Sequence, residues 1–164
     1  MNEGHIPMHD LQVGDCILTA SGDYKRVYAF GHKTPNTTTD FLRIFTDGYL
    51  NPLEVSPKHL LYVNNTKGFS VVPAKDIAEG DLLRSTEGRS TRVIDIRHVK
   101  REGMYAPFTT DGTLAVDGIV ASSYVMLGPM KSHPFISKRV HGVSHLAVSP
   151  IRFMCTRIST RICK

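Results

Sequence analysis

The stretch Met-His-Asp-Leu-Gln-Val-Gly-Asp at residues 8–15 returns at residues 74–81 as Ala-Lys-Asp-Ile-Ala-Glu-Gly-Asp, so both copies share an aspartate, an aliphatic residue and a closing Gly-Asp pair. Further matches follow in the same order at this offset or a nearby one, namely Arg26-Val27 with Arg92-Val93 and Thr46-Asp47-Gly48 with Thr110-Asp111-Gly112. Three ordered matches predict two similar halves made by duplication. Two copies are too few for a solenoid, so we expect the halves to interlock in one compact body with pseudo-twofold symmetry.

The sequence around these repeats consists of short β-favouring runs separated by Gly, Asp and Asn turn residues. We expect strands at Cys16–Thr19, Tyr24–Phe30, Phe41–Phe45, Tyr49–Val55, Leu60–Val63, Phe69–Val72, Leu82–Arg84, Arg92–Val99, Tyr105–Phe108, Leu114–Val116 and Ile119–Ala121. No segment up to about residue 125 shows sustained helical periodicity. The predicted fold class is therefore all-β.

Length and composition are those of an ordinary globular protein. The 164 residues, 41% of them hydrophobic and 21% charged, fit one domain or one domain with an appendage. No apolar run approaches the length of a membrane span, and the start lacks the basic and apolar regions of a signal peptide. Three scattered cysteines are too few for a disulfide scaffold or a four-cysteine zinc site, so we interpret them as buried small side chains or ordinary thiols.

The last part of the chain differs in charge. Residues 128–164 hold seven basic and no acidic residues, whereas residues 1–127 hold 13 basic and 15 acidic ones. From Ser149-Pro150, which suit an N-cap and a first helical position, apolar residues recur at helical spacing. We predict two domains, 1–127 and 128–164, the second with a basic amphipathic helical tail. This tail either contacts a membrane surface or packs against the β body.

Candidate chemistry lies at Ser56-Pro57-Lys58-His59, between two β-favouring runs. A hydroxyl and an imidazole three residues apart can form a catalytic pair, because an imidazole titrates near neutral pH. The alternative is a solvated turn with an incidental histidine. The motifs on either side of this stretch bear on that choice.

Four motifs follow one another between residues 4 and 125. They are L-x-V-G-D at 11–15, F-L-x-I-x-T-D-G at 41–48, L-x-V-S-P-x-H-L-L-x-V at 53–63, and G-x-Y-A-P-F-T with G-T-L-x-V-x-x-I-x-A-S at 103–122. Together they resemble the hedgehog C-terminal autoprocessing domain, a branch of the Hint (hedgehog/intein) superfamily. The resemblance implies an all-β Hint horseshoe of two pseudo-symmetric halves, which agrees with the internal repeat.

The resemblance also implies an intramolecular reaction. In this family a cysteine at the start of the domain attacks the preceding carbonyl to form a thioester, assisted by a histidine and by a hydroxyl residue three positions before it. His59 and Ser56 match these two positions, so we expect His59 to donate a proton to the departing nitrogen and Ser56 to polarise the amide. The upstream part of the precursor then passes to a sterol or another nucleophile.

Two further positions depart from the family pattern. His32 stands where the resemblance places an acidic base that activates the sterol, which keeps a possible base but puts cholesterol in doubt as the acceptor. A histidine there is similar to the nematode hedgehog-related branch. Ser123 stands where hedgehog sequences usually have a cysteine near the active site. Each also has a simpler interpretation, His32 as a surface histidine at a strand end and Ser123 as a strand-end hydroxyl.

The family nucleophile precedes residues 11–15 by one strand and a turn, and the sequence starts after that strand. We therefore expect this polypeptide not to cleave itself, either as a fragment of an autoprocessing enzyme or as a catalytically dead Hint fold that binds sterols or membranes. Expected partners are the upstream part of its precursor, a sterol or other lipid acceptor, and a membrane surface contacted by residues 149–164, with no nucleic acid, cofactor or metal. The precursor is expected in the secretory pathway, where glycosylation sequons at Asn36 and Asn64, both in predicted loops, become relevant.

Overall fold

A computed structural model of the protein describes residues 4–66 and 68–125. Its elements are β1 (Cys16–Leu18), β2 (Tyr24–Thr46), β3 (Leu53–Val55), β4 (His59–Asn65), β5 (Gly68–Pro73), η1 (Ala74–Asp76), β6 (Leu82–Arg84), β7 (Ser90–Thr109), β8 (Thr113–Val116) and β9 (Ile119–Val125). Within these two ranges the only helical element is the 3₁₀ turn η1, and no helix is long and apolar enough to cross a membrane. The predicted all-β class is confirmed.

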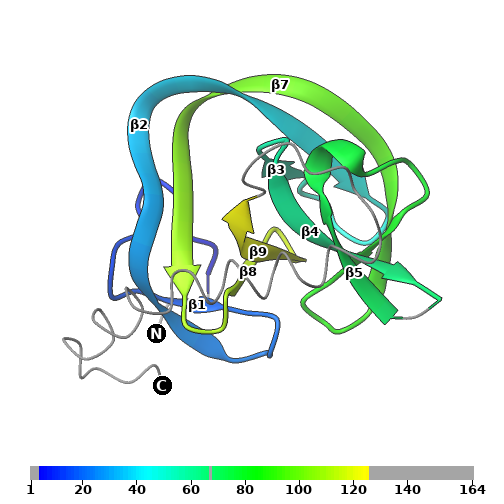
Figure 1. Cartoon of the computed structure of the whole chain (residues 1–164), viewed down its shortest axis with the longest axis horizontal. Helices are drawn as coiled ribbons and strands as arrows, with labels where there is room; N and C mark the ends of the chain where they lie inside the picture. Colours follow the sequence, from blue (N-terminus) through cyan, green and yellow to red (C-terminus); the bar gives the residue numbers. More distant parts are fainter. Residues whose placement is uncertain (1–3, 67, 126–164) are drawn as a thin grey trace.

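Two long strands form an arch around the other strands (Figure 1). β2 and β7 pair antiparallel from Val27 opposite Thr109 to Thr46 opposite Val93. The paired strands follow the order β1-β2-β7-β6-β4-β9-β8, with β3 on β2 and β5 on β4. Because β2 belongs to the first half of the repeat and β7 to the second, the halves interlock along the whole length of the arch, as the duplication predicted.

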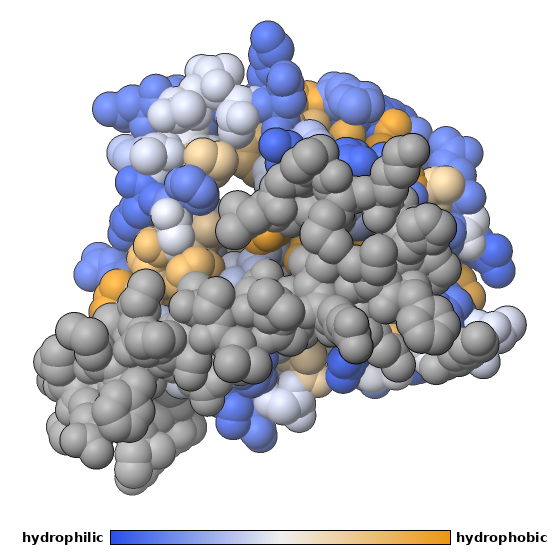
Figure 2. All heavy atoms as spheres, viewed as in Figure 1, coloured by the Kyte–Doolittle hydropathy of each residue, from blue (hydrophilic) through white to orange (hydrophobic). Residues whose placement is uncertain are grey.

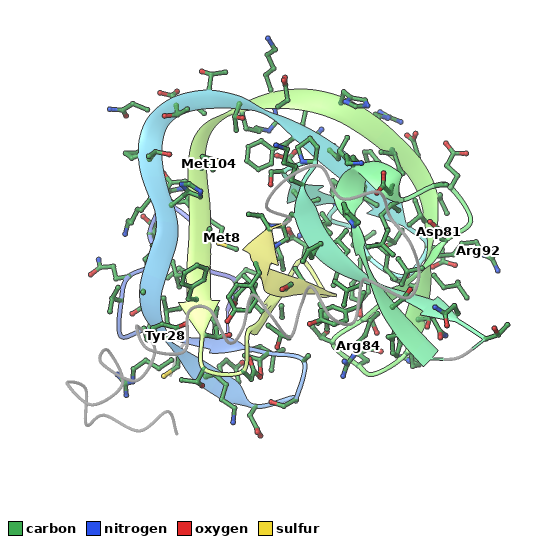
Figure 3. All side chains as sticks on the ribbon, viewed as in Figure 1. Met8, Tyr28, Asp81, Arg84, Arg92 and Met104 are labelled. Carbon is green, nitrogen blue, oxygen red and sulfur yellow. The ribbon has the colours of Figure 1, made fainter. Side chains whose placement is uncertain are left out.

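The repeated Gly-Asp segments form the same turn twice. Gly14 N–H donates to Val27 O at 2.8 Å, and Gly80 N–H donates to Val93 O at 2.8 Å. Both glycines have positive φ, 105° and 92°, a conformation that favours glycine because it has no Cβ. Figure 3 shows the second turn, with Asp81 beside Arg92.

Each turn is closed by its aspartate. Asp15 Oδ2 accepts a hydrogen bond from Gln12 N–H at 2.8 Å, and Asp81 Oδ2 accepts one from Ala78 N–H at 2.9 Å. Strand pairing repeats as well, since β1 pairs with β2 and β6 with β7 in matching registers. The Gly-Asp pair therefore recurs in the sequence because one residue makes the bend and the next satisfies a backbone donor.

Apolar side chains from both halves meet in two core clusters. The main cluster includes Leu42, Ile44, Leu53, Leu61, Leu83, Val93 and Leu114, all at most 3% exposed. Burial of such side chains stabilises a fold by about 1.5–3 kcal/mol each. Leu60 and Leu61 are buried immediately after His59, so the core fixes the position at which β4 begins.

Several predicted strands prove to be parts of longer ones. The predicted strands at 24–30 and 41–45 both lie in β2, and those at 92–99 and 105–108 both lie in β7. The connecting residues 31–40 are almost all exposed, so they lack the apolar alternation by which a strand is recognised in a sequence. The sequence prediction of a break in each strand was therefore wrong.

Three other expectations also change. The predicted strand at 49–55 is reduced to β3, because residues 47–52 form a loop longer than a two-residue turn. Asn36 lies in β2 and Asn64 in β4, so neither sequon is in a loop. Cys16 is exposed at the start of β1 and disulfide-bonded, not buried as a small apolar side chain. The predicted helical tail and the boundary at residue 127 lie outside the described residues.

Candidate functional site

A cavity of about 270 Å³ opens on the inner side of the arch. Figure 2 shows the molecule hollowed between the arch and the remaining strands, and in Figure 3 Met8 and Met104 lie in this space. The walls of the cavity are mainly apolar, with contributions from Met8, Leu53, Val55, Met104, Leu114 and Ala121. Ser56 and His59 line the same cavity, so the structure brings these two predicted site residues together.

The turn that carries both residues follows from local sequence. His59 N–H donates to Ser56 O at 3.0 Å, which closes a β-turn with Pro57 at its second position, where the fixed φ of proline is favoured. Pro57 O accepts a further hydrogen bond from Lys75 N–H at 2.8 Å. One hydrogen bond within the turn and one from Lys75 outside it thus fix the conformation of the turn in the absence of substrate.

The imidazole of His59 is oriented by a backbone carbonyl. His59 Nε2 lies 2.7 Å from Ser122 O in β9. A carbonyl oxygen only accepts, so Nε2 carries the proton and Nδ1 is the ring nitrogen that can titrate. No residue in the described part of the chain hydrogen-bonds Nδ1. His59 can therefore accept a proton at Nδ1 and return it to another atom.

Burial lowers the pKa of His59 below its ordinary value, because desolvation disfavours the charged imidazolium. The hydrogen bond to the Ser122 carbonyl acts in the opposite direction but more weakly. The resting imidazole is therefore neutral at pH 7. A neutral ring can act first as a base and then, once protonated, as an acid.

A carboxylate clamp forms another part of the cavity wall. Glu54 Oε1 accepts hydrogen bonds from Arg43 Nε at 2.6 Å and from Arg101 Nη2 at 2.8 Å, and Glu54 Oε2 accepts one from Arg101 Nε at 2.7 Å. The hydrogen bonds from Arg101, followed by those from Arg43, hold the pKa of Glu54 below its ordinary value. Glu54 thus stays ionised and ties β3 to both strands of the arch, a structural role and not a proton-transfer role.

Ser123 lies behind the cavity and does not line it. The residue is 2% exposed, and its Oγ lies 3.3 Å from Thr109 Oγ1 and accepts from Thr109 N–H at 3.4 Å. Ser123 N–H donates to Gly112 O at 2.8 Å. These bonds attach β9 to the end of β7, and so they hold the neighbouring Ser122 carbonyl that orients His59.

His32 lies apart from the other predicted site residues. It is exposed in β2, between the pairs Phe30 with Pro107 and Lys33 with Tyr105, where the register shifts. The side chain is not among those that line the cavity. Among the described residues the second imidazole at the cavity is His9, which the sequence analysis missed because this residue falls inside the repeated segment and was interpreted only as part of the repeat.

Comparison with known proteins gives concordant matches. The family model described as the Hint module matches residues 1–155. Warthog protein 1 of Caenorhabditis elegans is 31% identical over 144 residues, and Protein hedgehog of Drosophila yakuba is 29% identical over 161 residues, which cover 82% and 92% of this chain. The chain spans 29% and 32% of the length of these two relatives.

A solved structure matches the fold. The crystal structure of the gp41-1 intein superposes with a TM-score of 0.60 over 74% of this chain and 89% of the intein, at 17% sequence identity. At that identity the likeness concerns the fold alone. It agrees with the horseshoe built from two interlocked halves.

Proposed function

Because this chain belongs to the Hint family, we propose that it is an autoprocessing domain which, joined behind a Cys-led first strand, cleaves its precursor through an internal thioester and transfers the upstream part to a second nucleophile. The observation that carries this proposal is the His59 imidazole. It lines an apolar cavity, is fixed through Nε2 by the Ser122 carbonyl, and has Nδ1 available for proton transfer.

The first step is an exchange of an amide for a thioester. The cysteine thiol of a Cys-led first strand gives its proton to His59 Nδ1 and attacks the carbonyl carbon of the residue before that cysteine. The C–N bond breaks, and the departing nitrogen takes the proton back from Nδ1 while a C–S bond forms. The low pKa of His59 supports this order, because the ring starts neutral and finishes neutral.

Ser56 and Ser123 support this step in different ways. Ser56 lines the cavity, and no described residue forms a hydrogen bond with its Oγ. This hydroxyl can therefore donate a hydrogen bond to the amide under attack. Ser123 acts through β9, whose position sets the Ser122 carbonyl. In this proposal Ser56 touches substrate and Ser123 is a positioning residue.

In the second step an acceptor hydroxyl attacks the thioester carbonyl, the C–S bond breaks, and the thiolate leaves. The apolar lining of the cavity supports a lipid alcohol such as a sterol as the acceptor. The geometry gives no support to His32 as the base that takes the hydroxyl proton, because this side chain is exposed on β2 and does not line the cavity. The secretory pathway is the proposed setting, since precursors of the hedgehog type are secreted. Membrane contact by residues 149–164 belongs to this proposal and concerns residues outside the described ranges.

The test uses the full chain joined behind a Cys-led first strand taken from a Hint relative, with a reporter protein upstream. Added dithiothreitol should release the reporter by thiolysis, measured as the cleaved fraction on a gel over time. His59→Ala should slow release by about 100-fold or more, the range for loss of a general acid-base group. Release that is equally fast in His59→Ala would refute the assignment.

A matched control is His98→Ala, which removes an exposed imidazole of the arch that does not line the cavity. Its release rate should equal that of the unmodified protein. To test the second step, dithiothreitol is replaced by cholesterol, and the reporter is examined by mass spectrometry for an ester. Thiolysis without any ester would retain the first step and exclude this sterol as the acceptor.

A further inference from the structure

The arch contains a bulge in β2 around Asn36. Thr34 pairs with Met104 and Thr38 with Glu102, so three residues of β2 face the single residue Gly103 of β7. Extra residues in one strand cannot all join the ladder and are displaced from it. Asn36 is the middle one of the three and is exposed, as are its neighbours on both sides.

The bulge lies on an open edge of the molecule. β1 covers β2 at residues 24–26 and β3 covers it at residues 42–44. Between Ala29 and Asp40, the only strand in the described ranges that pairs with β2 is β7. The other edge faces solvent, and Asn36 is not among the residues that line the cavity. A large group attached at Asn36 would therefore meet neither the core nor the site.

We propose that Asn36 is a modification site that carries an N-linked oligosaccharide. Asn36-Thr37-Thr38 has the Asn-x-Thr pattern of the acceptor, with a residue other than proline in the middle. The amide nitrogen of Asn36 attacks C1 of the first sugar of a lipid-diphosphate-linked oligosaccharide and loses a proton. A C–N bond forms, the C1–O bond to the diphosphate breaks, and the lipid diphosphate leaves. This inference rests on the secretory route proposed above.

The second sequon provides a contrast. Asn64 is paired with Phe69 in the hairpin of β4 and β5, is partly buried, and donates from Nδ2 to Ser90 Oγ at 3.0 Å. A sugar on this partly buried nitrogen would crowd the contact with Ser90 that ties β4 to the start of β7. Two identical motifs therefore differ in whether the folded chain has room for the product, and only Asn36 has that room.

A glycan at Asn36 would also shield the open strand edge. Unpaired backbone groups of an exposed edge can recruit strands from other molecules, and proteins usually cover or interrupt such edges. Pro35 already interrupts it, because proline has no N–H to donate. An oligosaccharide next to Pro35 would extend this protection without touching the cavity.

The experiment expresses the full chain behind a cleavable signal peptide in cultured insect cells. Protein that has lost the signal peptide, whether secreted or retained, is treated with an amidase that removes N-linked glycans, and gel mobility is compared before and after. The unmodified sequence should shift, and Asn36→Gln and Thr38→Ala should abolish the shift. Thr37→Ala, which changes only the middle position, and Thr38→Ser, which restores a hydroxyl, should both retain it.

A mobility that the amidase does not change would overturn the proposal, as would a shift that survives Asn36→Gln and disappears with Asn64→Gln. Both outcomes are independent of autoprocessing. The protein for the cleavage test is to be produced in bacteria, which add no such glycan. A failure of that test therefore leaves the glycan result intact, and the reverse also holds.

Discussion

The two halves of the repeat share a backbone design and differ in what their Thr-Asp-Gly turns do. In the first half, Asp47 Oδ1 accepts from Thr91 Oγ1 at 2.7 Å and from Arg92 N–H at 2.9 Å, so this turn locks the end of β2 to the start of β7. In the second half, Asp111 Oδ1 accepts from Thr109 Oγ1 and from Thr113 Oγ1, both at 3.1 Å. Thr109 Oγ1 also lies 3.3 Å from Ser123 Oγ, so the second turn is connected through hydroxyl groups to Ser123 in β9.

This difference shows how one site is divided between two copies. The first half provides the turn with Ser56 and His59, and the second half provides the Ser122 carbonyl that orients the imidazole. Glu54 is shared in the same way, since Arg43 comes from the first half and Arg101 from the second. The two halves therefore share a backbone arrangement, and equivalent positions that differ in residue type contribute different groups to the one site.

The largest expected effect comes from the equivalent core positions Leu83 and Ile17. Leu83 is fully buried in β6, whereas Ile17 in β1 is only partly buried. Leu83→Ala should lower the free energy of unfolding by about 3 kcal/mol, and Ile17→Ala by about 1 kcal/mol, because the cavity left behind is smaller at a partly exposed site. Urea unfolding followed by circular dichroism measures both values. Equal decreases in the free energy of unfolding would contradict the difference in burial between Leu83 and Ile17.

The next effect concerns the repeated glycines. Gly80→Ala has no neighbouring atom within 4 Å of the added Cβ, and Gly14→Ala meets only the end of the Arg26 side chain at 3.9 Å. Each substitution should therefore cost about 1–2 kcal/mol from the positive φ alone, and the two losses should agree. Denaturant midpoints of the two variants give the comparison, and a loss confined to one glycine would mean that the turns are not equivalent.

The third prediction separates stability from chemistry. Asp47→Ala and Asp111→Ala each remove hydrogen bonds worth about 1 kcal/mol apiece, so both variants should lose stability by similar amounts. Only Asp111→Ala should also slow thiolysis in the Cys-led protein, because its network holds β9 and the Ser122 carbonyl. Release rates and unfolding curves are measured on the same preparations. If Asp47→Ala slows release to the same degree, the proposal that only the Asp111 turn supports the site is wrong.

The smallest expected effect is the pH dependence of the shared clamp. The pKa of Glu54 is lower in the folded protein than in the unfolded chain, so its contribution is fully present above about pH 5. As pH falls below the unfolded value, near 4.5, the unfolded chain takes up protons first and this stabilisation is lost. Unfolding free energies between pH 7 and 3 should fall less steeply in Glu54→Gln. Parallel curves for the two proteins would contradict the ionised clamp.

The sequence was most informative where one residue type is required by local geometry. The Gly-Asp pairs predicted the duplication, and they recur because the positive φ and the backbone donor of each turn can be satisfied by few residues. Ser56 and His59 were found because their side chains are polar between apolar strands. The bent middle of β2 was missed because a two-stranded ribbon exposed on both faces has no apolar alternation.

The carbonyl of Ser122 had no sequence signature at all, because any residue can provide a backbone oxygen. Ser123 was singled out because the family resemblance usually places a cysteine at this position, and the structure shows that its buried hydroxyl supports the strand. The Glu54 clamp depends on the register of β2 with β3, in which Arg43 lies opposite Glu54. That register follows from a loop of six residues between the strands, and a two-residue Asp-Gly turn would have placed other residues opposite Arg43.

The pairing of β2 with β7 has a consequence for the origin of the fold. Val27 lies opposite Thr109 and Val93 lies opposite Thr46, so each copy finds in the other the partner for its long strand. A chain with one copy would have had to bind a second identical chain before this strand was paired, which describes an ancestral homodimer with two equal sites. Within one chain the two copies can differ in sequence, so only one of the two equivalent positions has to keep the residues of a site.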